Sequence, residues 1–189
     1  MRDYGFVHLS AGDLLRAHMK SGSADGQMVA DMIANGQIVP SSVTVNLLRG
    51  AIAKAAAESG ARKFLVDGFP RNAENRDAWE AQARAHTLFT KHSLITLTMV
   101  AIQAGYDCAM VLFFDVPEAV MEARLLARQE GRTDDNAATI RKRFAVFQEQ
   151  TQPVVAHYDA KGKVARVAGV GTPAEVYEAT KPHFAAFKA

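Results

Sequence analysis

The sequence has a single cysteine and almost no excess of charge. Cys108 stands alone among 189 residues, so no disulfide forms within the chain, and a reducing, intracellular compartment is the simple interpretation. The apolar neighbours of Cys108 favour a buried structural thiol. The 22 Lys and Arg residues nearly balance 20 Asp and Glu residues, giving a formal charge of +2 that does not favour binding to nucleic acid or to a membrane.

Long hydrophobic runs, repeats and linkers are also missing. The first residues lack the apolar core of a signal peptide. The longest apolar stretch, residues 93–102, is too short to span a bilayer, so a packed insertion is favoured over an oligomer contact or membrane association. The six histidines show no zinc-ligand spacing. We therefore expect one domain, residues 1–189, with its own hydrophobic core.

Short apolar runs alternate with helical patterns along the chain. The runs predict strands at residues 6–9, 63–66, 110–114 and 164–168. Helical periodicity is found at residues 11–20, 25–35, 41–59, 72–84, 117–128, 135–158 and 173–184. Thr172 is a natural cap before Pro173, and Asp135 or Asn136 is expected to cap the helix that follows. This alternation predicts an α/β fold, in which helices cover both faces of a parallel sheet.

The most informative stretch is residues 64–75, where an apolar strand leads into Asp67, Gly68, a Phe-Pro pair and Arg71. Ligands of open parallel sheets bind beyond the carboxyl ends of the strands, which is where Asp67 and Arg71 would lie. An arginine there presents a planar fork to phosphate oxygens, and an aspartate can hold a magnesium ion or its waters. The alternative for Asp67 is a carboxylate that only caps the turn.

Further arginines cluster near residue 130. Arg124 and Arg128 are four residues apart and share a helix face, Arg132 follows the helix break at Gly131, and Arg143 lies in the next helix. For one arginine alone, a solvated helix face would be the better interpretation. As a set, they favour a flap that closes over an anionic substrate and expels water.

Four motifs in the same order resemble the nucleoside monophosphate kinases, which include the adenylate kinases. They are the residue runs 8–16 (HLSAGDLLR), 36–40 (GQIVP), 67–71 (DGFPR) and 131–135 (GRTDD). The resemblance covers nearly the whole chain except about residues 84–104. It is closest to the UMP-CMP kinases, because Asn75 matches the asparagine with which they read the pyrimidine edge, where adenylate kinases usually carry glutamine.

The resemblance implies a P-loop NTPase-like, three-layer αβα fold with a monophosphate-binding lobe at about 11–40, an insertion at about 84–104 and a short lid at about 128–136. It also implies a cis peptide before Pro70. Among the expected site residues, those of the monophosphate site are Ser10, Arg16, Ile38, Val39, Gly68, Arg71 and Asn75. Those of catalysis are Asp67, Arg128, Arg132 and Arg143, and those of the ATP site are Arg124 and Gly171. For Ile38 and Val39, simple packing is nearly as good an interpretation.

One motif of the family is missing from the sequence. No G-x-x-x-x-G-K-[ST] loop occurs among the 189 residues, and in the family this loop cradles the ATP phosphates and follows a central strand of the sheet. We therefore expect an amino-terminally truncated version whose sheet lacks that strand, with an uncovered edge as the consequence.

Together these features predict transfer of the ATP γ-phosphoryl group to UMP or CMP, with Mg²⁺ bound alongside ATP and reached by Asp67 only through water. The expected partners are ATP and a nucleoside monophosphate, and the expected protein is a monomer in the cytoplasm, with the nucleus as a second location. Two alternatives stay open: an adenylate kinase acting on AMP, and a non-catalytic nucleotide-binding remnant.

Overall fold

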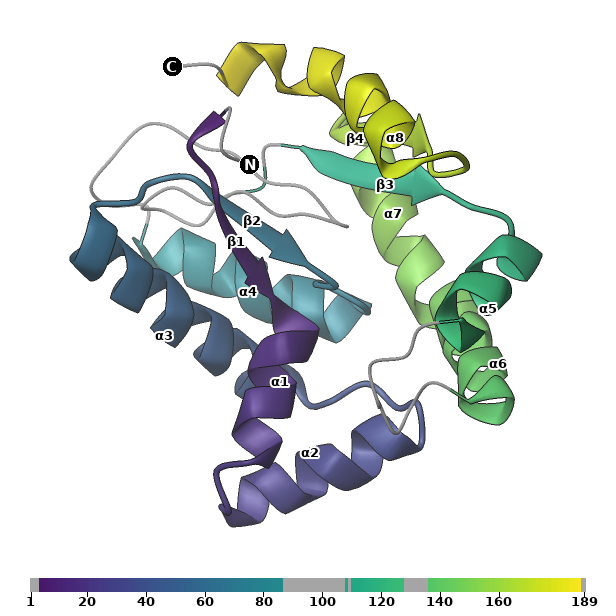
Figure 1. Cartoon of the computed structure of the whole chain (residues 1–189). Helices are drawn as coiled ribbons and strands as arrows, with labels where there is room; N and C mark the ends of the chain where they lie inside the picture. Colours follow the sequence, from purple (N-terminus) through teal and green to yellow (C-terminus); the bar gives the residue numbers. More distant parts are fainter. Residues whose placement is uncertain (1–3, 87–107, 109, 128–135, 188–189) are drawn as a thin grey trace.

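Parallel strands form the centre of the structure, a computed structural model that describes residues 4–86, 108, 110–127 and 136–187 (Figure 1). Strand β1 (Val7–Ser10) pairs in parallel with β2 (Phe64–Asp67), and β3 (Val111–Asp115) pairs in parallel with β4 (Val164–Ala168). The described strands thus form two two-stranded sheets. The four predicted strands and their parallel direction are confirmed.

The helices also follow the predicted pattern. Thr172 caps the helix that begins at Pro173, and its side chain and that of Glu175 form a reciprocal capping box. Asn136, not Asp135, caps the helix before Arg143: its Oδ1 accepts the Thr139 N–H at 3.0 Å. The α-helices are α1 (Ala11–Met19), α2 (Ala24–Ala34), α3 (Ser41–Ser59), α4 (Ala73–His86), α5 (Glu118–Leu126), α6 (Ala137–Val146), α7 (Gln152–Asp159) and α8 (Pro173–Thr180), and a 3₁₀ helix, η3 (Lys181–Phe187), follows α8.

The helical segment predicted over residues 135–158 is present, with an irregular turn inside it that the sequence pattern did not predict. The segment is helical throughout from Ala137, but a π-helical turn, η2 (Phe147–Thr151), separates α6 from α7. The Gln152 N–H donates to the Phe147 carbonyl, five residues back, instead of four. Pro153 is the physical reason, because it has no N–H and its ring would clash with the carbonyl four residues before it.

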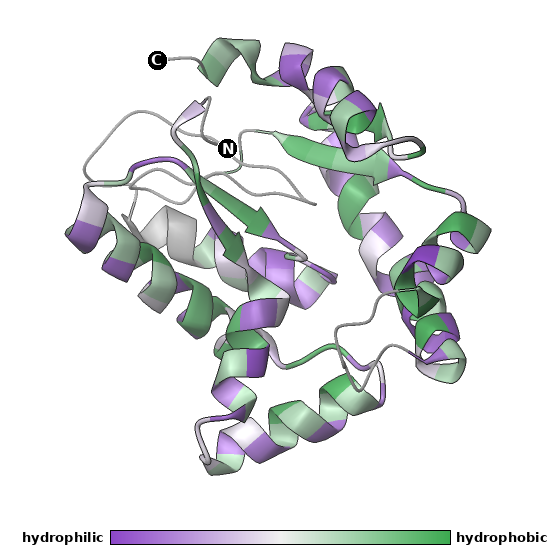
Figure 2. Ribbon diagram, viewed as in Figure 1, coloured by the Kyte–Doolittle hydropathy of each residue, from purple (hydrophilic) through white to green (hydrophobic). Residues whose placement is uncertain are grey.

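Helices cover the strands on both faces, as the sequence predicts for an αβα fold. Along β2, Phe64 and Val66 face a core that includes α3, α4 and α7, whereas Leu65 faces a second core with Phe184 of η3. Leu112 of β3 belongs to the same second core. A strand buried on both faces reads as a continuous apolar run, which is why these strands are visible in the sequence. Figure 2 shows the hydrophobic residues of the strands enclosed by helices that carry hydrophilic residues outward.

Helices α1 and α2 lie at one end of the molecule with a small core of their own (Figure 1). Leu15 of α1, Val29 of α2 and Val39, which precedes α3, are its buried members. This core positions α1 so that its first turn follows directly from the end of β1. In the described part of the chain, no helix is both long and apolar enough to cross a bilayer.

Candidate functional site

The ends of β1 and β2 bring two separate motifs together. Ser10 and Asp67 are partners in the parallel register, so the two strands end side by side. Ser10 is also the N-cap of α1, where its Oγ accepts the Asp13 N–H at 3.2 Å. The carboxyl ends of the strands therefore open onto the start of a helix, the usual place for a ligand of a parallel sheet.

A tight turn after β2 carries Arg71 back over this corner. Gly68 has a φ of +73°, and a Cβ there would lie 3.2 Å from Arg71 Nη2, so both backbone conformation and space favour glycine. The Gly68 carbonyl accepts a hydrogen bond from Arg71 Nε at 2.9 Å. The Phe69–Pro70 peptide is cis, as the resemblance implies. The turn thus holds the Arg71 guanidinium against the backbone of Gly68.

Asn75 fixes the same turn from the first part of α4. It is only 2% exposed; its Oδ1 accepts the Arg71 N–H at 3.1 Å, and its Nδ2 donates to Ser41 Oγ at 2.8 Å. Asn72 Oδ1 in turn accepts the Asn75 N–H at 2.8 Å. Asn72 and Asn75 therefore both have a structural role in this turn, and contact of Asn75 with a base stays a prediction.

Arg16 reaches the corner from α1. Its Nη2 lies 2.5 Å from Asp13 Oδ1, and its Nε donates to the same oxygen at 3.2 Å. The partly exposed pair spans one helical turn, so its contribution to stability is small. Its effect is geometric: Asp13 holds the guanidinium beside Gly12, where a Cβ would approach Arg16 Nη2 to 3.2 Å.

These side chains surround a cavity of about 320 Å³, which we call the polar cavity. Arginines from three elements line it: Arg16 of α1, Arg71 after β2 and Arg143 of α6. The cavity thus combines cationic side chains with a pocket of the size that takes a small ligand. The remaining lining residues are His8, Ser10, Ala11, Gly12, Asp13, Leu15, Ile33, Gln37, Ile38, Val39, Thr44, Asp67, Gly68, Phe69 and Asn75.

Asp67, the last residue of β2, contributes a carboxylate to the polar cavity. Burial raises the pKa of its carboxyl above the usual value of 3.8, and the charge of Asp13 adds to the rise. The positive charges of His8, Arg71 and Arg16 lower the pKa and oppose that effect. Burial is the largest of these influences, so the ionised carboxylate is costly and would be stabilised by a further cation or its bound water.

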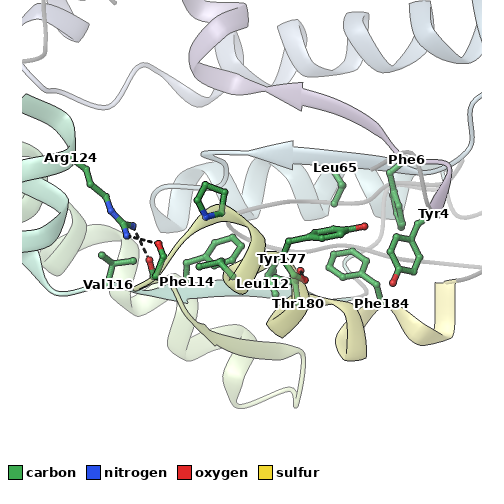
Figure 3. Close-up of a pocket in the computed structure, with 14 residues that line it drawn as sticks. Tyr4, Phe6, Leu65, Leu112, Phe114, Val116, Arg124, Tyr177, Thr180 and Phe184 are labelled. Atoms are coloured by element: carbon green, nitrogen blue, oxygen red, sulfur yellow. Dashed lines mark hydrogen bonds between the residues drawn. The ribbon is translucent and has the colours of Figure 1, made fainter. Parts of the chain in front are cut away.

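Arg124 and Gly171 lie elsewhere, in a second cavity of about 640 Å³ that we call the apolar cavity (Figure 3). Arg124 Nη1 donates to the Gly169 carbonyl at 2.8 Å, and Nη2 donates to the Gly171 carbonyl at 3.3 Å. Figure 3 shows the rings of Tyr4 and Phe6 at the opposite end from Arg124. The structure thus brings together the two residues expected at the ATP site and separates them from the three arginines of the polar cavity.

Two predicted arginines, Arg128 and Arg132, lie outside the described residues, as do Asp134 and most of the insertion predicted at about 84–104. Sequence reasoning also missed residues of the site. One of them is His8, which lines the polar cavity. Alternate residues of a strand face the same side, so the expected position of Ser10 at the site would also have predicted His8. Ser41 has no comparable signal, since its partner Asn75 lies 34 residues away.

Comparisons with known proteins agree with the motifs. The profile of a family described as adenylate kinase matches residues 1–163. Probable UMP-CMP kinase 1 of Arabidopsis thaliana is 45% identical over 98% of this chain and 78% of its own length. UMP-CMP kinase 3 of the same plant is 48% identical over 96% of this chain and 77% of its own length. Uridylate kinase of Saccharomyces cerevisiae is 38% identical over 94% of this chain and 78% of its own length.

Proposed function

The chain belongs to the adenylate kinase family of nucleoside monophosphate kinases, and from this premise we propose that it transfers the γ-phosphoryl group of ATP to UMP or CMP. The observation that carries the proposal is the meeting of Arg16, Arg71 and Arg143 around one cavity at the ends of two parallel strands. Phosphoryl transfer needs positioning and positive charge around phosphate oxygens more than covalent help from the protein.

Each arginine has a distinct part in this proposal. Arg71 and Arg16 hold the phosphate of the acceptor nucleotide, because each guanidinium is already oriented by a neighbour, Gly68 or Asp13. Arg143 lines the same cavity from α6 and neutralises charge on the group being transferred. Arg128 and Arg132 are proposed to complete the positive surroundings of that group, and Arg124 and Gly171 to contact ATP.

Mg²⁺ accompanies ATP in this family, and Asp67 is suited to contact the metal through a metal-bound water. Asp67 is the carboxylate at the strand end whose ionised form is disfavoured by burial, so a nearby cation or a cation-bound water would stabilise it. Mg²⁺ usually keeps several waters and takes its other ligands from phosphates. When bound, the metal neutralises charge on the phosphates; Asp67 accepts hydrogen bonds from its waters.

Selectivity for a pyrimidine is assigned to Asn75. Its bonds to Arg71 and Ser41 use one donor and one acceptor of an amide that has two of each, so the amide can also contact a base edge. Ile38 and Val39 form an apolar wall of the same cavity, suited to a base or ribose.

The test is titration of the chain with CMP, UMP and AMP, followed by transfer assays with Mg-ATP. We expect CMP and UMP to bind at least about tenfold more tightly than AMP, and Asn75→Gln to narrow that ratio. Preference for AMP would instead make the protein an adenylate kinase. Nucleotide binding with no transfer from Mg-ATP would favour the non-catalytic alternative.

The setting of the enzyme is part of the proposal. The single cysteine supports a cytoplasmic location, with the nucleus as the second candidate. We also propose that the protein is a monomer. Analytical ultracentrifugation would test this: a dimer at micromolar concentration would contradict it.

A further inference from the structure

Arg71 is held on both sides of its Cα atom. Its N–H donates to Asn75 Oδ1 at 3.1 Å, and its carbonyl accepts a hydrogen bond from Thr151 Oγ1 at 2.7 Å. These two contacts fix the peptide before Arg71 and the peptide after it. Because the two peptide planes determine φ and ψ, they also determine the direction in which the Cα–Cβ bond leaves the backbone.

The second contact joins distant parts of the chain. Thr151 ends the π-helical turn η2, 80 residues beyond Arg71 in the sequence, and it is 8% exposed. Threonine hydroxyls inside helices commonly donate to a carbonyl of the preceding turn. A hydroxyl has one hydrogen, and Thr151 directs it out of the helix to Arg71 instead. Wide π-helical turns are often found at functional sites, and here the turn carries the residue that reaches the Arg71 carbonyl.

The same helical segment carries Arg143. Residues from Ala137 to Asp159 form one continuous helical segment through α6, η2 and α7, and both Arg143 and Thr151 belong to it. Arg71 and Arg143 line the same polar cavity from different elements. The Thr151 hydroxyl therefore sets the position of one arginine relative to the element that supplies the other.

We propose that Thr151 is a positioning residue for binding of the acceptor phosphate, acting through the backbone of Arg71. The inference rests on the proposed function, since it takes the phosphate to be the group that Arg71 holds. Without the hydroxyl, the Arg71 carbonyl loses the hydrogen bond from Thr151, and the peptide between Arg71 and Asn72 is held less firmly. A misplacement of about 1 Å is enough to weaken a bidentate guanidinium–phosphate contact substantially.

A second buried threonine provides a matched control. Thr180 of α8 is 7% exposed, and its Oγ1 donates to the Tyr177 carbonyl at 2.6 Å, within its own helix. Thr180 lines the apolar cavity and not the polar cavity, where the acceptor phosphate is proposed to bind. Thr151→Val and Thr180→Val thus remove a hydroxyl from similarly buried positions, and only the first change removes a hydrogen bond to the Arg71 carbonyl.

The experiment measures affinity for CMP and for cytidine by NMR titration, which follows both tight and millimolar binding. We expect Thr151→Val to weaken CMP binding about tenfold or more while cytidine affinity stays within about twofold, because only the phosphate depends on Arg71. Thr151→Ser, which keeps the hydroxyl, restores CMP affinity, and Thr180→Val leaves both affinities unchanged. If Thr151→Val does not fold, Thr151→Cys replaces it, since it differs from the serine variant by one weakly donating atom.

The possible outcomes distinguish failure of the positioning role from failure of the proposed function. Failure of the unaltered chain to bind CMP, UMP or AMP would refute the proposed function, and the inference with it. Binding by the unaltered chain with undiminished CMP affinity in Thr151→Val would refute only the positioning role. An equal loss for CMP and cytidine would also refute it, because a general structural defect does not distinguish ligands by their phosphate.

Discussion

The polar and apolar cavities differ in size and in chemistry, and the smaller one is the better candidate site. The apolar cavity has about twice the volume, but its walls are mainly aromatic and aliphatic, and its arginine, Arg124, is bonded to backbone carbonyls. The polar cavity is lined by arginines from three parts of the chain and by the half-buried carboxylate of Asp67. Convergence of charge from separate elements is thus a better guide to this site than volume, because anions need fixed positive groups.

The largest expected effect is that of Arg71→Ala on the polar cavity. If Arg71 binds the acceptor phosphate as proposed, removing its guanidinium should weaken CMP binding by about 100-fold or more, or ~3 kcal/mol, and abolish transfer. Arg62→Ala, at an exposed position before β2, is the control and should change nothing. Calorimetric titration measures both, and CMP affinity retained within about threefold would remove Arg71 from the site.

Leu112→Ala tests the apolar cavity, and here we expect a change in stability without a change in CMP affinity. Leu112 is fully buried, so its truncation should lower the free energy of unfolding by about 2–5 kcal/mol, whereas CMP affinity below the melting temperature should not change. Urea unfolding measures the loss. Leu126→Ala, at a position 50% exposed, should cost much less. A specific fall in CMP affinity in folded Leu112→Ala would show that the two cavities act as one site.

Ser41→Ala examines the hydrogen bonds beneath the polar cavity. The substitution leaves the buried Asn75 Nδ2 without its serine partner, so we expect a loss of about 1–3 kcal/mol in the free energy of unfolding and a smaller preference for CMP over AMP. Ser42→Ala changes the neighbouring, exposed serine and should leave both quantities as they were. Equal stability of the two variants would mean that the Ser41 contact contributes nothing.

Asp67→Asn should have the smallest effect of these variants, and it should raise the stability of the protein instead of lowering it. Because the folded-state pKa of Asp67 is raised, its contribution to stability is fully present below pH 3.8 and is lost as the pH rises through the folded-state value. Asparagine avoids the cost of a buried charge, so the variant should melt about 2–4 °C higher at pH 7, and the difference should shrink toward pH 3.8. Calorimetry across this range measures it; a variant that melts lower at pH 7 would show that Asp67 is net stabilising when ionised.

The sequence carries much of the fold because local patterns encode it. The apolar runs that form β1 to β4 and the cap at Thr172 were predicted from short stretches of residues, and the cis peptide before Pro70 was implied by the family resemblance. The helical segment predicted over 135–158 is found from Ala137 to Asp159, but the π-helical turn before Pro153 was not predicted, because the helix-breaking proline was given too little weight. Base contact by Asn75 and the roles of the arginines remain predictions, since they concern bound nucleotides.

The sequence by itself determined the strand and helix order, the motifs that place the chain in its family, and the arginines that could serve a phosphate. The tertiary structure alone decided which of these meet: Arg16, Arg71 and Arg143 share the polar cavity, whereas Arg124 turns to the backbone of Gly169. Only the tertiary structure shows the hydrogen bonds that support these site residues. Asn75 donates to Ser41 across 34 residues, and Thr151 donates to the Arg71 carbonyl across 80 residues. The physical reason is that caps and periodicity act within a few residues, while hydrogen bonds between elements depend on how the whole core packs.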